Sequence, residues 1–365
     1  MKKIFMLLLL LFILGLMTSA KAAEVSDELT NAAGLDELQQ AAEGYMDEVP
    51  LNTKLSLNDG IPALAEKAKN AMSGIIRGAV SSGVKLMVIV LLCGLAEGIE
   101  PEGAYGTIRV VSLLGALAVT TVAASDIRSL LGMGREAIDS ISGFSKALLP
   151  TMSTVTAMGG APASAAARQL ATLLFSDMLI TAIDRLLLPM LYLYIALCAA
   201  KAAVGNDGLK RVAGTIKSLI VTFLAVLLLT FVGYLTVSGV IAGSTDAVTV
   251  KAAKFTISSM IPVVGGILSD AAETVLAGAA ILKGAVGVFG MLTVLSICLV
   301  PFISLGIQYL TYKIAAALSA TVGAGPVVGL IDGIGEAFAL MMGMTGACAL
   351  ILLISMVSGI SMVTS

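Results

Sequence analysis

The sequence predicts an all-α polytopic membrane protein with about eight transmembrane helices, two broken or re-entrant segments and an inverted internal repeat. Composition indicates the class: of 365 residues, 58% are hydrophobic and 13% are charged, and the mean hydropathy is +1.01. Such values are typical of chains whose main solvent is the bilayer. Apolar runs of about 20 residues, the length that crosses a bilayer, occur repeatedly along the chain. Prolines and a lysine that recur at one fixed interval indicate the repeat.

The composition also argues against several classes of function. The net charge of −2 and the lack of a basic, aromatic-rich patch argue against nucleic-acid binding. The chain contains no histidine, which rules out a Ser-His-Asp triad and removes the commonest metal ligand. Its four cysteines are too scattered for a zinc site, and neither a Walker loop nor a G-x-S-x-G elbow occurs. We therefore expect no enzyme activity, no cofactor and no metal.

The first 72 residues are predicted to lead out of the cytoplasm. Residues 1–22 have the pattern of a secretory signal peptide: two lysines, an apolar run and an A-x-A site that ends at Ala22. An uncleaved signal anchor is the alternative. Residues 23–72 form an acidic extracytoplasmic segment with two short helices, one of which places Leu35, Leu38 and Ala42 on one face. These helices would contact a partner or lie on the membrane surface.

Two transmembrane helices are expected within residues 73–125, near 75–96 and 105–124. Lys85 falls inside the first of them. A lysine at this depth must pair, face water or extend to the interface. Residues 126–143 mix charged and apolar side chains and are expected to form an amphipathic connection at the membrane surface.

The rest of the chain divides into two copies of a repeat, residues 144–243 and 250–365. Pro150, Pro189 and Lys201 recur 112 residues later as Pro262, Pro301 and Lys313. Each copy is expected to begin with a broken segment, because proline and paired glycines interrupt apolar runs too short to span a membrane. The residues that interrupt the runs are Pro150, Gly159 and Gly160 in the first copy, and Pro262, Gly265 and Gly266 in the second.

The copies are expected to be inverted with respect to each other. Residues 163–204 are too long for one span, so we place a turn at Asp184-Arg185 and further spans at 218–243, 278–295, 298–316 and 337–362. Three spans and a broken segment in each copy reverse the orientation of the second. Basic residues accumulate in the connection around residue 211, but not in its counterpart around residue 330. The first connection should therefore lie in the cytoplasm and the second outside.

Ionisable residues within or beside the apolar runs are the candidate pathway residues. Asp177 and Asp184 are seven residues apart and therefore share a helix face. They could line a hydrophilic path or pair with Lys85 across helices. Arg185 follows directly, and Lys201 and Lys313 lie near expected helix ends, where long basic side chains extend to the interface.

Three further stretches stand out beside the signal and acidic segment: KFTISSMIPVVGGILSDAAETVLAG at 254–278, YKIAAAL at 312–318 and GAGPVVGLID at 323–332. Together these segments resemble the stage III sporulation protein AE family of endospore-forming bacteria. The resemblance implies a multi-pass protein of the mother-cell membrane around the forespore. The partners that it implies are membrane lipid, the other proteins of the stage III A operon and the forespore-side protein Q. It supplies no catalytic or substrate residues.

The resemblance implies a permease-like or pore-lining component of the sporulation channel that connects mother cell and forespore. Two alternatives come from other classes of protein. One is a free-standing secondary transporter of a small molecule, as paired broken helices suggest. The other is a structural membrane scaffold on which the complex assembles. Transport by the purified protein in liposomes separates a transport protein from a scaffold.

Overall fold

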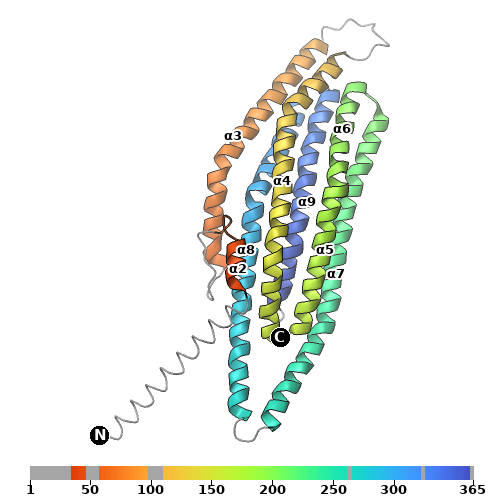
Figure 1. The fold of residues 1–365 in the computed structure, drawn as a ribbon. Coiled ribbons are helices and arrows are strands. Elements are labelled where there is room, and N and C mark those ends of the chain that lie inside the picture. The colour runs from red at the N-terminus through yellow and green to blue at the C-terminus, as the bar shows by residue number, and fades with distance from the viewer. Residues whose placement is uncertain (1–33, 47–56, 98–109, 261–264, 322–324, 362–365) are drawn as a thin grey trace, which may run out of the picture.

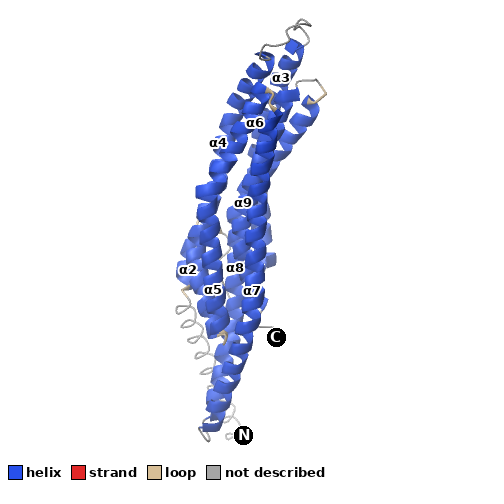
Figure 2. Cartoon of the chain, turned by 90° about the vertical axis from the view of Figure 1, so that its right-hand side faces the viewer, coloured by secondary structure: helices blue, strands red, loops and turns tan. Residues whose placement is uncertain are grey.

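A computed structural model describes residues 34–46, 57–97, 110–260, 265–321 and 325–361, and in the stretch 239–277 the backbone alone. All regular elements in these ranges are helices, which lie side by side in an elongated bundle (Figures 1 and 2). Six of these helices are long and apolar enough to cross a membrane, so the chain is a multi-pass membrane protein. In chain order the elements are α2 (Leu35–Ala41), α3 (Leu57–Glu97), α4 (Val110–Met158), α5 (Pro162–Ala182), the π-helical turn η1 (Ile183–Leu187), α6 (Leu188–Val204), α7 (Asp207–Met260), α8 (Gly265–Ser319) and α9 (Gly325–Ser361).

The helices are longer than the expected spans, which explains why the described residues contain six helices able to cross a membrane where about eight spans were expected. α4 has 49 residues and α8 has 55. At 1.5 Å per residue these helices are about 70–80 Å long, more than twice the thickness of the hydrocarbon core. The segments expected at 278–295 and 298–316 are both parts of α8. The amphipathic segment 126–143 is likewise no separate surface helix, because it continues the span before it as the middle of α4.

The expected turn at Asp184-Arg185 is also absent. These residues lie in η1, and the chain continues in the same direction into α6. Pro189 follows immediately, at the start of α6. A proline lacks the N–H that a regular helix needs and its ring displaces a carbonyl of the preceding turn. A π-helical turn relaxes that geometry locally, so the helix absorbs the proline without reversing.

The first broken segment is interrupted only at its glycines. α4 passes through Pro150 and ends at Met158, and Gly160 then adopts a left-handed conformation with φ of 87°. Pro150 is exposed on the outer face, as is Lys146 four residues earlier, so water can reach the carbonyl that the proline leaves unpaired. In the second copy Pro262 lies outside the described residues, and Gly265 and Gly266 form the first turn of α8.

The two segments expected to be copies of a repeat run in the same direction, whereas the sequence predicted that they would be inverted. The hairpin from α5 through α6 to α7 has its counterpart, 112 residues later, in the hairpin from α8 to α9. Each pair of short spans expected from the sequence is one long helix in the structure. Each half therefore crosses the length of the bundle an even number of times. As a result, the second half begins at the same end of the bundle as the first. The beginnings of α7 and α9 therefore lie at the same end of the bundle (Figure 1).

Helices α8 and α9 form the centre of the bundle, and glycines allow their close approach to neighbouring helices. A Cβ at Gly290 of α8 would lie 2.6 Å from Leu148 of α4 and 2.7 Å from the sulfur of Met356 of α9. Small residues at such crossings are the usual packing device of membrane helices. The face of α2 that carries Leu35, Leu38 and Ala42 is buried, as its spacing predicted.

Candidate functional site: a polar layer across the bundle

Four charged side chains from three helices meet near one end of the bundle. Lys313 of α8 donates to Asp332 at 2.7 Å and to Glu336 at 2.5 Å, both on α9. Lys217 of α7 donates to the other oxygen of Glu336 at 2.6 Å. Two cations and two carboxylates cancel in charge, so this group, the ionic cluster, can remain among apolar helices.

The ionic cluster is partly shielded from the surroundings. The Glu336 side chain is 20% exposed and that of Lys313 is 29% exposed, whereas those of Lys217 and Asp332 are more accessible. The Lys313 ammonium also lies 5.8 Å from the centre of the Tyr309 ring, within the range of a cation–π contact. Asp332 and Glu336 are four residues apart, so one face of α9 presents both carboxylates to α8.

A second polar group continues this layer toward α4. Asp126 of α4 accepts hydrogen bonds from Gln308 at 2.8 Å and from the Tyr312 hydroxyl at 2.9 Å, both from α8. Tyr312 is fully buried, and its ring contacts Phe338 of α9 edge-on. Together with the ionic cluster, this group extends from α4 to α7 across the bundle. We call this set of seven residues the polar layer: Asp126, Lys217, Gln308, Tyr312, Lys313, Asp332 and Glu336.

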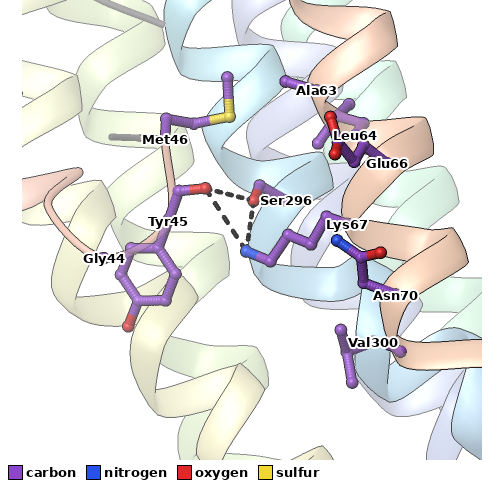
Figure 3. Close-up of a pocket in the computed structure, with 11 residues that line it drawn as sticks. Gly44, Tyr45, Met46, Ala63, Leu64, Glu66, Lys67, Asn70, Ser296 and Val300 are labelled. Atoms are coloured by element: carbon purple, nitrogen blue, oxygen red, sulfur yellow. Dashed lines mark hydrogen bonds between the residues drawn. The ribbon is translucent and has the colours of Figure 1, made fainter. Parts of the chain in front are cut away.

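A separate pocket of about 470 Å³ lies where the segment after α2 and the first turns of α3 meet α8 (Figure 3). In it the Lys67 ammonium donates to the Ser296 hydroxyl at 2.8 Å, and that hydroxyl donates to the Tyr45 carbonyl at 2.6 Å. Glu66 and Asn70 also line the pocket, so its walls carry both charge and hydrogen-bonding groups. These contacts fasten residues expected in the extracytoplasmic segment to the middle of α8.

The structure places the sequence-predicted residues in different surroundings. Lys85, Asp177 and Arg185 are exposed on the outer surface of the bundle. Asp184 pairs with Arg135 of α4 at 3.3 Å. Within the described residues, Lys85 forms no ion pair with either aspartate. Lys313 is in the polar layer, and Lys201 is half-buried at the same end, where its ammonium lies beside Gly329 of α9.

Sequence reasoning did not identify several residues that the structure brings together. Asp126 lies 182 residues before Gln308 and 186 before Tyr312, and no short motif joins it to them. The i, i+4 pair of carboxylates on α9 is a signal that could have been found. Two buried cations were also missed: Arg168 of α5 is 6% exposed and Lys283 of α8 is 1% exposed.

The polar layer contains charged and hydrogen-bonding groups that can bind or guide ions. No group of three or more metal-ligating side chains occurs in the described parts of the chain. The arrangement is therefore suited to holding helices in register and to contacting hydrophilic solutes at the end of the bundle.

Comparison with known proteins gives two matches. The family model described as stage III sporulation protein AE matches residues 34–362. A Bacillus subtilis (strain 168) protein named stage III sporulation protein AE is 26% identical over 248 residues, which are 68% of this chain and 62% of that protein. The aligned region thus covers less than two thirds of the relative. No solved structure matches the chain.

Proposed function

Because the chain belongs to the stage III sporulation protein AE family, we propose that it is a permease-like or pore-lining component of the sporulation channel between mother cell and forespore. It would act in the mother-cell membrane around the forespore, without enzyme activity of its own. Its partners would be membrane lipid, the other proteins of the stage III A operon and the forespore-side protein Q. The family supports the sporulation role, and the six spanning helices support a role inside the membrane.

The polar layer is the observation that carries the transport part of this proposal. Charged side chains are rare in apolar helices, and those that occur usually face the interior of a bundle or a water-filled cavity. Here the paired groups of the ionic cluster lie within three of the long apolar helices, and Asp126 adds a fourth helix. Polar groups at such positions are typical of paths for ions and hydrophilic solutes.

Basic residues support one orientation of the bundle. The end that carries the ionic cluster also carries Lys201, Lys210 and Arg211. Such an excess of lysine and arginine favours the cytoplasm. α3 then enters from outside, in agreement with an extracytoplasmic N-terminal segment, and α9 ends outside after an even number of crossings.

The passage of α4 through Pro150 and of α8 through Pro301 gives a free-standing secondary transporter less support than interrupted helices would. Transporters of that class commonly bind substrate where paired helices are interrupted at mid-membrane. In the described residues, the long helices pass through Pro150 and Pro301 without interruption, and one π-helical turn replaces a break. The scaffold alternative predicts a membrane complex that assembles without any solute path in this chain.

Complementation tests the proposal. An endospore-forming host that lacks its own stage III AE protein should regain spores when it produces this chain. It should also regain passage of a small fluorescent solute from mother cell to forespore. Restored spores without restored passage would favour the scaffold. Failure to restore either, with the protein present in the membrane at normal abundance, would contradict the proposal.

A further inference from the structure

Helix α4 presents a continuous polar surface to the outside of the bundle. From residue 118 to residue 158 it exposes no large hydrophobic side chain. Its outward positions are polar, charged or small, and the polar and charged ones recur at helical spacing. We call this surface the α4 stripe and define it by Ser125, Arg128, Arg135, Glu136, Asp139 and Lys146, all of which are exposed.

The α4 stripe is as long as the hydrocarbon core is thick. Arg128 and Lys146 are 18 residues apart in one helix, or about 27 Å. The opposite face of this segment is apolar and buried, with Leu131, Ile138 and Ile141 among its residues. The segment is therefore amphipathic, and it packs in the bundle between α3 and α5 (Figure 1).

Contacts place the α4 stripe at the depth of uncharged parts of α8 and α9, and the charged first turns of α3 lie at the same level, where Lys67 contacts Ser296. Asp126, next to the first stripe residue, contacts Gln308 of α8, and Leu148, just after the stripe, lies against Gly290 of α8. Between residues 290 and 308, α8 contains no charged residue, and these 19 residues rise about 28 Å. From residue 337 to its end, α9 has none either.

The outer face of α7 at the same depth is apolar. Phe231 of α7 stacks against Phe175 of α5, nine residues before the Asp184 that pairs with Arg135 of the stripe. Beside it, Leu229 is 72% exposed and Val226 is 57% exposed. One flank of the bundle thus suits lipid, while the α4 stripe at equal depth does not.

We propose that the α4 stripe lines a water-filled path through the bilayer for ions or small hydrophilic solutes. Within the described residues Arg135 is the one charged stripe residue in an ion pair, so the others require water or an external partner. Copies of the chain oriented alike would bring equal charges to equal depth, which disfavours dry contact between their stripes. The carbonyl that Pro150 leaves unpaired, at the exposed end of this surface, also requires water.

The order of charges along the stripe indicates which charges a solute would meet in the path. In chain order the charged stripe residues are Arg128 and Arg135, then the acidic Glu136 and Asp139, then Lys146. Charged side chains at defined depths are a common means of selecting ions in pores. Asp177 and Arg185, exposed on the helices next to α4, add further charge to this side of the bundle.

Cysteine labelling tests the inference in the full-length protein. All four native cysteines are replaced by alanine, and single cysteines are placed at Ser125, Ser129, Gly132 or Gly143, which keeps every charge of the stripe. Gly132 and Gly143 have open space where the new side chain would be. Leu229→Cys is the control on the lipid-facing surface and Ile141→Cys is the buried control on α4. The probe is a charged, membrane-impermeant methanethiosulfonate applied to sealed membranes.

We expect the stripe cysteines to react at least tenfold faster than both controls. Stripe cysteines as slow as Leu229→Cys would overturn the inference, because they would then face lipid or a dry protein contact. Equally fast labelling of Leu229→Cys would also overturn it, since this part of the bundle would then lie outside the bilayer.

The transport role of the path rests on the proposed function, and a second measurement separates the two. Modification of Gly132→Cys should slow the passage of solute in complemented cells at least threefold. If the stripe cysteines react rapidly but the protein passes no solute, the proposed function would be contradicted. The inference that the stripe faces water would still hold. If solute still passes in complemented cells while the stripe cysteines do not react with the reagent, only the inference that the stripe faces water would be contradicted.

Discussion

Lys217 of α7 lies 2.6 Å from Glu336 of α9, so two residues separated by 119 positions in the chain close the same end of the bundle. This contact fixes the relative direction of the two halves. Because Lys313 of α8 binds the same carboxylate, the starts of α7 and α9 and the end of α8 must all lie at one end of the bundle.

Topology mapping should therefore place both connections on the cytoplasmic side. In a cysteine-free background, Arg211→Cys and Ala320→Cys should both react with an impermeant reagent only when the cytoplasmic face is accessible. Ala161→Cys, in the turn between α4 and α5, should react only from the other side. Reaction of residues 211 and 320 from opposite sides would restore the inverted repeat and contradict the arrangement of helices.

Glu336→Gln should destabilise the bundle. The substitution removes the charge that two lysines share, and we expect a loss of about 1 kcal/mol in the free energy of unfolding, because the group is only partly shielded. Lys210→Gln, at an exposed position near the same end, is the matched control and should change stability little. Thermal unfolding of the purified protein in detergent measures both. Equal stability of Glu336→Gln and wild type would mean that the ionic cluster does not hold the helices together.

Tyr312→Phe should cost about 1 kcal/mol of unfolding free energy, because a buried hydroxyl that binds Asp126 is lost while the ring remains. The control is Tyr192→Phe on α6, where the side chain is 53% exposed. Chemical unfolding of the two variants would compare them directly. If Tyr312→Phe were as stable as Tyr192→Phe, the hydrogen bond from Gln308 would be enough to satisfy the Asp126 carboxylate without the Tyr312 hydroxyl.

Two glycines of α8 should respond to alanine in opposite directions. At Gly290 a Cβ would lie 2.6 Å from Leu148 and 2.7 Å from Met356, so Gly290→Ala should destabilise by about 1–3 kcal/mol. At Gly284 nothing lies within 4 Å, so Gly284→Ala should stabilise by about 1 kcal/mol through helix propensity. Melting temperatures of the two variants give the signs. A stabilised Gly290→Ala would contradict the close contact of α8 with α4 and α9.

The sequence predicted the class of the fold well, because composition and long apolar runs directly reflect the solvent in which a chain folds. It was less successful at helix ends. Pro150 was expected to interrupt a helix, yet a proline on one face of a long packed helix costs less than unpacking that helix. Dividing the apolar runs into spans of about 20 residues also gave wrong helix boundaries. Helices that extend beyond the membrane have no sequence signal at the point where the bilayer ends.

The candidate site was predictable only in part. Lys313 was singled out, but its carboxylate partners were not, since pairing across helices depends on the rotation of each helix about its axis. Asp177 is exposed on the outer surface, and Asp184 pairs with Arg135, a partner that no spacing rule could identify. The amphipathic character of residues 126–143 was recognised from the sequence. Its position inside the bundle, level with uncharged segments of α8 and α9, required the structure.

The central claim is that this chain itself provides a path for hydrophilic solutes, and current through a planar bilayer tests it most directly. The full-length protein is inserted alone and together with its proposed operon partners. We expect stepwise ion currents that fall when the impermeant thiol reagent modifies Gly132→Cys and that persist when the reagent is added to the cysteine-free protein. Correctly inserted protein that gives no current above that of the bare bilayer, with or without the partners, would contradict the claim.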